Sequence, residues 1–228
     1  MIKTSRTIPA DRIRLLIFDL DGTLIDSERD LANSVNAMLA HFGKPELSME
    51  VIARFIGDGA PMLIRRALGD PDDGAYFREA LEFFLQHYRD HKLDNTYVYA
   101  GIREALEAMR ANAQKQRSLA VLTNKPVNAS KQIMQGLGLS DFFFQVYGGN
   151  SFATKKPDPL GANTLLQESG AKPEEAVMIG DSMIDVVTAR NAGMFSVGVS
   201  YGFRPETLQL SPPDVLVDTP AELAEVLK

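Results

Sequence analysis

The chain contains no cysteine. This absence excludes thiol nucleophiles, iron–sulfur clusters, disulfides and cysteine-based zinc sites. The chain also lacks a basic excess, because 24 Lys and Arg stand against 30 Asp and Glu, giving a net charge of −6. An acidic surface repels phosphate backbones and anionic lipid headgroups, so we expect neither a nucleic-acid nor a membrane partner. The lack of cysteine fits a reducing compartment, and we expect a cytoplasmic protein.

Long hydrophobic runs are absent as well. The longest strand-like apolar stretch, residues 15–20, is interrupted by Asp19 and falls far short of the ~20 residues that span a bilayer. Residues 1–14 have no apolar region or cleavage site of the kind found in signal peptides, and we expect them to form a short frayed lead-in. With 228 residues, 45% of them apolar, the chain is long enough to bury a real core as one large or two small domains.

The order of predicted elements divides the chain into two parts. Residues 13–20 are almost continuously apolar and end at Asp-Gly, which predicts a buried strand followed by a turn. No strand signal occurs in the next part, where periodicity predicts helices over residues 27–42, 48–56, 60–68 and 75–92. After Tyr97, strands and helices alternate. The strands are predicted at 118–123, 144–147, 176–180, 196–199 and 215–217, and the helices at 102–111, 128–137, 160–169, 184–192 and from 220 onward.

Alternating strands and helices predict an α/β fold, in which a parallel, Rossmann-like sheet is flanked by helices on both faces. Because the first strand belongs to this sheet, the all-helical stretch is an insertion after it. We therefore expect a core domain made of residues 1–26 and 98–228, with an inserted helical cap domain at 27–97. The two chain crossings near residues 26–28 and 97–100 would act as a hinge.

Polar side chains gather where the predicted strands end. The first strand ends in Asp19-Leu20-Asp21-Gly22-Thr23-Leu24, and the next ends in Thr123-Asn124-Lys125. Lys156 follows the third strand, and the fourth ends in Gly180-Asp181-Ser182, with Asp185 one helical turn later. Ligands of parallel sheets bind beyond the carboxyl ends of the strands. We expect these carboxylates, the hydroxyl and the ammonium to share one site.

The residue types in this site predict phosphate chemistry. Crowded carboxylates repel one another unless a cation or protons neutralise them. Oxygen ligands without His or Cys favour a hard cation, and Mg²⁺ fits such a partial ligand set best. Mg²⁺ beside Thr and Lys donors binds phosphate, and a carboxylate can attack phosphorus to form an aspartyl-phosphate.

These segments resemble the four motifs of the haloacid dehalogenase-like hydrolase superfamily, and the helical insertion is similar to its C1-type cap. The resemblance implies that Asp19 is the nucleophile and that Asp21 protonates the leaving group and then activates water. It implies a Mg²⁺ ion held by the carboxylates of Asp19 and Asp181 and by the backbone carbonyl of Asp21. Asp185 would support the metal through water or from the second sphere.

The resemblance also implies phosphate-binding residues. Thr123 and the backbone of Asn124 would bind the phosphoryl oxygens, with Gly22 and Thr23 also placed at the substrate, and Lys156 would orient Asp19 and balance its charge. Because Asp21 is present, the motif argues against a dehalogenase, which lacks this residue.

Within the superfamily, the stretches Asp26-Ser27, Asp30-Leu31 and residues 55–60 look most like bacterial phosphoglycolate phosphatases. We therefore expect the reaction to be hydrolysis of 2-phosphoglycolate to glycolate and phosphate. Gly57 and Gly59 let backbone approach a small substrate, and we place Asp58 and Arg66 at the substrate too, with Arg66 available for a second anionic group. Related pyrophosphatases carry a similar Ile-Gly pair, so a pyrophosphatase or a sugar-phosphate phosphatase is the alternative.

Two other readings stay open from the residues. A non-catalytic aspartate phospho-receiver also combines acidic residues, Thr and Lys at strand ends, although it needs neither the helical cap nor Asp21; repeated turnover would separate the two. His87 and His91 stand four apart, the spacing of a zinc pair, but no third ligand is evident, and surface positions fit them better. The expected partner is a small phosphorylated metabolite, bound by a monomer or homodimer.

Overall fold

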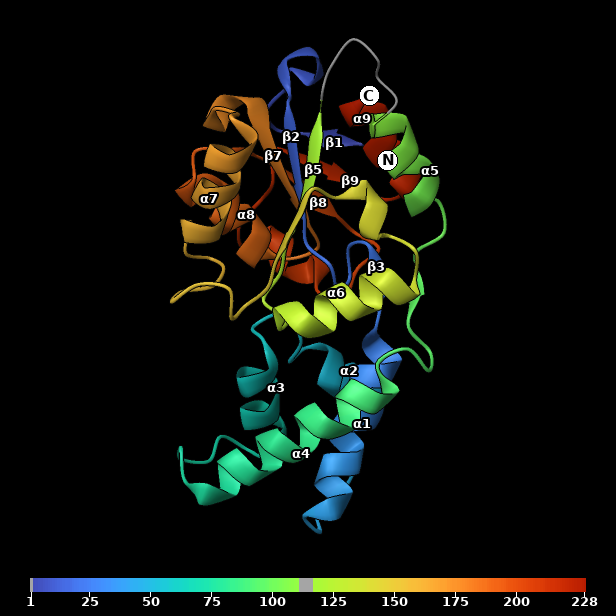
Figure 1. Ribbon diagram of the computed structural model, residues 1–228, viewed down its shortest axis with the longest axis vertical. Coiled ribbons are helices and arrows are strands. Elements are labelled where there is room, and N and C mark those ends of the chain that lie inside the picture. Colours follow the sequence, from blue (N-terminus) through green and yellow to red (C-terminus); the bar gives the residue numbers. More distant parts are fainter. Residues whose placement is uncertain (1, 111–116) are drawn as a thin grey trace.

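The computed structural model describes residues 2–110 and 117–228, and a seven-stranded sheet forms its centre (Figure 1). The strand order is β1-β9-β8-β7-β2-β5-β6. The strands are β1 Lys3–Thr4, β2 Leu15–Phe18, β5 Ser118–Leu122, β6 Gln145–Tyr147, β7 Ala176–Gly180, β8 Phe195–Val199 and β9 Val215–Val217. From β9 to β6 the strands run parallel, as the alternation of elements predicted.

Both faces of β2 are buried because helices cover the sheet on each side. Leu16 and Phe18 pack into the same core as α5 (Ile102–Arg110), α6 (Val127–Gly136) and α9 (Pro220–Leu227). Leu15 and Ile17 point to the other face and pack with α7 (Leu160–Ser169) and α8 (Met183–Asn191). Side chains alternate across a strand, so a four-residue run that is apolar at every position fits a strand covered on both faces. The predicted helix over 102–111 ends at a residue outside the described ranges.

The expectation of a frayed N-terminal lead-in is wrong. β1 pairs antiparallel with the edge strand β9, with Lys3 opposite Leu216. The Ser5 N–H then donates to Asp214 O at 2.8 Å, and the buried Ile8 and Ile13 anchor the residues that follow. Without β1, the edge of β9 would expose unpaired backbone N–H and C=O groups, and residues 3–4 pair with these groups. The sheet is therefore mixed at this one edge.

Four helices lie together beyond one end of the sheet (Figure 1). They are α1 Glu28–His41, α2 Met49–Ala53, α3 Ala60–Ala67 and α4 Ala75–His91, called here the helical segment. All four predicted helices are present, although α2 is shorter than expected. Val35 and Met38 of α1 and Phe84 of α4 are fully or almost fully buried in a common core.

A two-stranded antiparallel sheet joins the helical segment to the rest of the chain. β3 (Ile25–Asp26) pairs with β4 (Tyr97–Val98), where the chain leaves the central sheet and returns to it. The sequence did not predict this pairing. The division of the chain into a core domain and a cap domain stays a prediction. No helix in the described part of the chain is long and apolar enough to cross a bilayer.

Candidate active site

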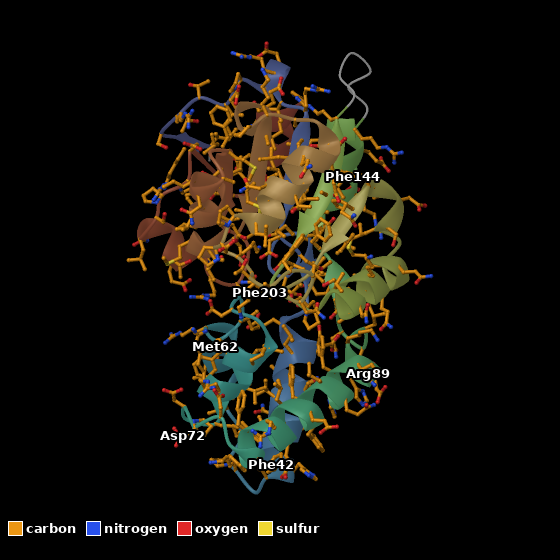
Figure 2. The ribbon with its side chains drawn as sticks, turned by 60° about the vertical axis from the view of Figure 1, so that its left-hand side comes forward. Phe42, Met62, Asp72, Arg89, Phe144 and Phe203 are labelled. Atoms are coloured by element: carbon orange, nitrogen blue, oxygen red, sulfur yellow. The ribbon has the colours of Figure 1, made fainter. Side chains whose placement is uncertain are left out.

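A pocket of about 460 Å³ lies between the carboxyl ends of the central strands and the helical segment. Asp19, Thr123 and Asp181 line it from the ends of β2, β5 and β7, while Gly57 and Tyr88 line it from the helical segment. Figure 2 shows Phe203, another lining residue, at the junction of these two parts. The parallel register brings the three strand ends together as predicted, because Phe18 lies opposite both Val121 and Ile179.

Three buried carboxylates form an acid cluster, consisting of Asp19, Asp181 and Asp185. One oxygen from each lies within 4.8 Å of the others. A single ammonium enters the cluster: Lys156 Nζ lies 3.0 Å from Asp19 Oδ1 and 2.6 Å from Asp185 Oδ1. Burial lowers the pKa of Lys156, but the two carboxylates outweigh this effect and raise it above its usual value. The cluster therefore holds more negative than positive charge.

Among the described residues, Asp181 is the carboxylate of the cluster without a positively charged partner. Its Oδ2 accepts hydrogen bonds from the backbone N–H groups of Phe203 at 2.7 Å and Arg204 at 3.2 Å. Burial, together with the charges of Asp185 and Asp19, raises the pKa of Asp181 to about 8. Burial likewise raises the pKa of Asp19 to about 6, although Lys156 opposes the rise. A buried all-oxygen donor set with excess negative charge fits a hard divalent cation.

Asp185 is already fully engaged by protein donors. Its Oδ2 accepts from the N–H and the hydroxyl of Ser182, at 3.2 and 2.8 Å, in a capping box at the start of α8. Its Oδ1 accepts from Lys156. This arrangement favours a supporting role, because a metal bound directly by Asp185 would share an oxygen with one of these donors.

Two glycines make room for these carboxylates. Gly22 has φ +78°, and a Cβ there would lie 2.8 Å from Asp181 Cγ and closer still to its Oδ2. Gly180 ends β7, and a Cβ there would overlap the Asp185 carboxyl group. Gly22 of the first motif therefore allows the backbone both to turn and to approach the acid cluster closely.

Asp21, the second carboxylate of the first motif, has different partners. Lys125 Nζ lies 2.9 and 3.0 Å from its two oxygens, and Ser27 Oγ donates to Oδ1 at 2.5 Å. Ser27 directly precedes α1, but the N–H of Glu28 at the start of that helix donates instead to Asp26 Oδ1, at 3.1 Å. The sequence motifs imply no role for Lys125, although its position directly after Thr123-Asn124 at a strand end places it near the site.

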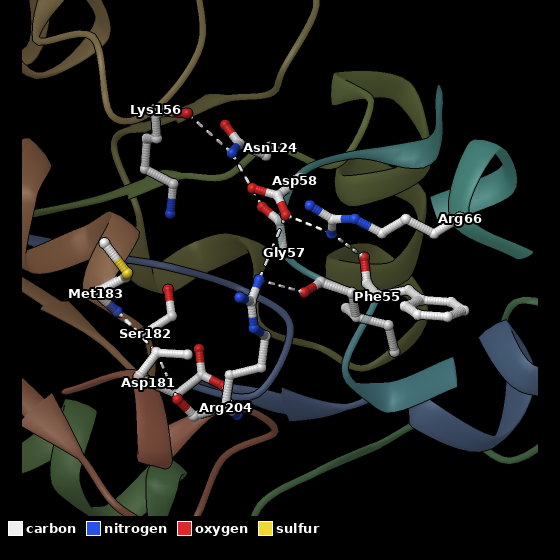
Figure 3. Close-up of polar contacts among 12 residues, drawn as sticks. Phe55, Gly57, Asp58, Arg66, Asn124, Lys156, Asp181, Ser182, Met183 and Arg204 are labelled. Carbon is white, nitrogen blue, oxygen red and sulfur yellow. Dashed lines mark hydrogen bonds and ion pairs between the residues drawn. The ribbon is translucent and has the colours of Figure 1, made fainter. Parts of the chain in front are cut away.

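Thr123 and Asn124 lie at the end of β5 and line the pocket. The Asn124 side chain bridges two loops, because Nδ2 donates to Gly57 O at 3.0 Å and to Lys156 O at 3.1 Å (Figure 3). The predicted use of the Asn124 backbone for phosphate is compatible with this contact, which occupies the side chain only.

The loop between α2 and α3 contacts the strand-end loops through a cluster of charges. Asp58 Oδ2 lies 2.5 Å from Arg66 Nη1 and 3.4 Å from Arg204 Nη1, and both guanidinium groups point at it in Figure 3. Arg204 Nη1 also donates to Ile56 O at 3.0 Å. Nothing in the sequence points to Arg204, which follows β8 in a stretch without a recognisable motif.

The predicted substrate residues divide into two groups. Gly57, Gly59 and Asn124 line the pocket, whereas Gly22, Thr23, Asp58 and Arg66 are not among its lining residues. Thr23 is fully buried, and its carbonyl accepts from the Tyr201 hydroxyl at 3.1 Å. Contact of these four residues with a substrate stays a prediction.

Comparison with known proteins identifies the family. A family model described as haloacid dehalogenase-like hydrolase matches residues 16–199. The chain belongs to this family of hydrolases. The match extends from β2 to the end of β8, and so it contains both the acid cluster and the helical segment. Family membership confirms the prediction of an enzyme, and the reading as a non-catalytic phospho-receiver loses its support.

Relatives of this hydrolase carry a more specific name. A phosphoglycolate phosphatase from Chromobacterium violaceum is 39% identical over 95% of this chain and 97% of its own length. One from Psychrobacter arcticus is 37% identical, with 94% of this chain and 96% of the relative covered. A crystal structure described as a predicted phosphoglycolate phosphatase from Haemophilus somnus superposes with a TM-score of 0.87 at 31% identity, covering 95% of this chain and 99% of that one.

His87 and His91 of this hydrolase each contact another polar side chain. The rings of His87 and His91 stack with centroids 4.3 Å apart, but His87 Nδ1 lies 3.0 Å from Ser34 Oγ and His91 Nδ1 lies 2.8 Å from Asp94. Within residues 2–110 and 117–228, the acid cluster is the one group of three or more candidate ligands.

Proposed function

We propose that this hydrolase is a Mg²⁺-dependent phosphatase that hydrolyses a small phosphate monoester through an aspartyl-phosphate on Asp19. The observation that carries the proposal is how Asp19 is held. Its Oδ1 accepts from the Leu20 N–H at 2.7 Å and pairs with Lys156 at 3.0 Å, whereas Oδ2 accepts no hydrogen bond from the described residues. One oxygen is thus fixed, and the other is available to attack at the pocket.

In the first half-reaction, Asp19 Oδ2 attacks phosphorus, and the bond from phosphorus to the ester oxygen breaks. Asp21, which also lines the pocket, gives a proton to the departing oxygen. In the second half-reaction, Asp21 takes a proton from water, and the water oxygen attacks phosphorus. The bond from phosphorus to Asp19 breaks, inorganic phosphate leaves and the Asp19 carboxylate is restored.

The other pocket residues hold the phosphoryl group and balance charge. Thr123 and the Asn124 N–H would donate to phosphoryl oxygens, and Lys156 keeps Asp19 oriented and ionised. The carboxylates of Asp19 and Asp181 and the carbonyl of Asp21 would hold Mg²⁺, with Asp185 in support. When bound, the metal supplies positive charge that offsets the repulsion between the carboxylates and the phosphate.

We further propose that residues 27–97 act as a cap domain over a core of 1–26 and 98–228. The pocket is bounded by both parts, and β3 with β4 joins them at two short crossings. Movement about these crossings would admit the substrate and then exclude bulk water. The cytoplasmic location and the choice between monomer and homodimer stay predictions from the sequence.

The proposed substrate is 2-phosphoglycolate, a small ester whose carboxylate adds a second anionic group. Relatives at 35–39% identity over nearly the whole chain bear the name phosphoglycolate phosphatase, which supports this substrate over the alternatives. Pyrophosphate and sugar phosphates are the alternatives of the same chemistry.

Phosphate release from a panel of 2-phosphoglycolate, pyrophosphate and sugar phosphates tests the proposal, with Mg²⁺ or EDTA present. We expect 2-phosphoglycolate to be turned over fastest, EDTA to stop turnover, and Asp19→Asn to lose it by about 10⁴-fold or more, because no other group in the site can take over as nucleophile. Undiminished turnover by Asp19→Asn would overturn the mechanism. A panel without preference for 2-phosphoglycolate would overturn the substrate and leave the mechanism intact.

A further inference from the structure

The Asp21 carboxylate is held more tightly than a group that only needs to exchange protons with solvent. Lys125 Nζ bonds both of its oxygens, and Ser27 Oγ adds a third bond to Oδ1. Two bonds from one ammonium to the two oxygens fix the plane of the carboxylate as well as its position. Asp21 thus has a defined orientation at the pocket wall.

Lys125 contacts an aromatic ring as well as Asp21. Its side chain is 4% exposed and lies in the loop that follows β5. The ring of Tyr88, a residue of α4 that is 5% exposed, lies over the ammonium with its centroid 4.6 Å from Nζ. An ammonium over an aromatic face is attracted by the ring. Tyr88 therefore connects α4 of the helical segment, through Lys125, to Asp21.

We propose that Lys125 is a positioning residue that orients Asp21 for proton transfer, and that Tyr88 makes this orientation depend on the placement of α4. The inference rests on the proposed function, in which Asp21 protonates the leaving oxygen. A general acid must lie within hydrogen-bond reach of the atom it serves, and small misplacements cost large factors in rate. In this role Lys125 acts through the Asp21 carboxylate and not on the substrate.

A comparison of leaving groups separates this role from a merely structural one. Loss of Asp21 orientation slows esters whose alkoxide leaving group needs a proton, whereas p-nitrophenolate departs without one. Single-turnover release of the leaving group isolates the first half-reaction, because hydrolysis of the aspartyl-phosphate, which also uses Asp21, is common to both esters. For Lys125→Met we expect this rate on 2-phosphoglycolate to fall about 10- to 100-fold, at or below the lower end of the roughly 10²- to 10⁴-fold that general acid catalysis contributes. On p-nitrophenyl phosphate we expect a fall of about twofold or less. Lys125→Arg, which keeps the charge and two donors, recovers part of the difference.

A double-mutant cycle adds a second, independent measurement. If Lys125 acts through Asp21, then Lys125→Met has no further effect on 2-phosphoglycolate turnover once Asp21→Asn is present. The double variant also removes both buried charges together, so it folds without an unpaired carboxylate. Tyr88→Leu is expected to show the same preference for the aryl ester, to a smaller degree. Lys131→Met, an exposed lysine of α6, is the matched control and leaves both rates unchanged.

The outcomes distinguish failure of this inference from failure of the proposed function. Equal losses on the two esters, or independent effects of Lys125→Met and Asp21→Asn, would overturn the role of Lys125 while the wild type stays active and Asp19→Asn inactive. Absence of phosphate release from the wild type with both esters, or full activity of Asp19→Asn, would instead overturn the proposed function.

Discussion

The charges of the carboxylates in the site are compensated to different degrees. Asp21 faces Lys125, while Asp19 and Asp185 share Lys156. Within the described part of the chain, only backbone N–H groups donate to Asp181, and its raised pKa reflects burial beside two other carboxylates. The uncompensated negative charge thus lies at Asp181, which is where a cation would be most stabilising.

Gly22 provides a prediction at the residue scale, because its backbone passes directly under Asp181. In Gly22→Ala the new Cβ would overlap the Asp181 carboxyl group, in addition to straining a backbone at φ +78°. We expect a loss of activity of about 100-fold or more, because a displacement of about 1 Å in a ligand of the site already costs about 10²-fold. Phosphate release and Mg²⁺ affinity by calorimetry measure it.

Gly43→Ala is the matched control for this substitution. Gly43 has φ +64°, but a Cβ there meets no atom within 4 Å. Gly43→Ala therefore has the same backbone strain as Gly22→Ala, about 1 kcal/mol, but no overlap with a carboxyl group. We expect lower unfolding stability and unchanged activity. Equal activity of the two variants would show that the space beside Asp181 is not needed.

At this scale, the sequence predicted the residues that belong to motifs and missed those defined by contacts. Asp19, Thr123, Lys156 and Asp181 follow strands, and parallel strands bring their carboxyl ends to one edge. Arg204 lies in a loop without periodicity, and its contact with Asp58 depends on how the loops are folded. No local pattern in the sequence encodes such a contact.

At the scale of elements, the α2–α3 loop is the part of the helical segment that contacts the strand ends most closely. Asn124 Nδ2 donates to Gly57 O, Lys155 Nζ donates to Asp58 O at 2.5 Å, and Arg204 reaches both Ile56 O and Asp58. These contacts hold the loop over the pocket in the conformation described.

Asp58→Asn is the prediction for this element. It removes the negative charge shared by Arg66 and Arg204 and leaves the two guanidinium groups facing each other. A partly exposed ion pair contributes up to about 1 kcal/mol, so we expect KM for 2-phosphoglycolate to rise about fivefold while kcat changes less than twofold. Steady-state phosphate release measures both constants.

Asp73→Asn is the control for this variant, because Asp73 pairs with Arg65 at an exposed position within the helical segment. We expect its KM to match that of the wild type. An unchanged KM in Asp58→Asn would contradict a role of the charge cluster in holding the loop.

The elements that the sequence failed to predict are the short ones. β2, β5 and β7 are apolar at nearly every position and were predicted, whereas β1, β3 and β4 have two residues each. Ile25 pairs with Val98, more than 70 positions away, and Lys3 pairs with Leu216 across almost the whole chain. Two-residue strands have no periodicity, and only the tertiary structure supplies their partners.

At the scale of the whole molecule, an acidic chain with a net charge of −6 is proposed to bind an anionic substrate. The net negative charge of the chain does not attract an anion over long distances, so the electrostatic potential within the site has to be positive. Lys156 and Lys125 are each paired with carboxylates within it. A divalent cation at the acid cluster would supply the remaining positive charge.

Because a cation at the acid cluster would offset its negative charge, we expect Mg²⁺ to stabilise the folded chain, independently of any turnover. A cation that binds only the native acid cluster, present at about 100 times its Kd, adds about 2.7 kcal/mol. For a chain of this size that corresponds to a rise in Tm of about 5–10 °C.

We expect this rise for the wild type and for Asp141→Asn, an exposed carboxylate outside the site, at constant ionic strength. Asp181→Asn relieves repulsion between carboxylates in the metal-free protein, so its Tm without Mg²⁺ should equal or exceed that of the wild type. Because the substitution also removes a proposed ligand, its Tm should change by less than about 2 °C when Mg²⁺ is added. A wild-type rise that Asp181→Asn reproduces in full would place the bound cation elsewhere on the molecule.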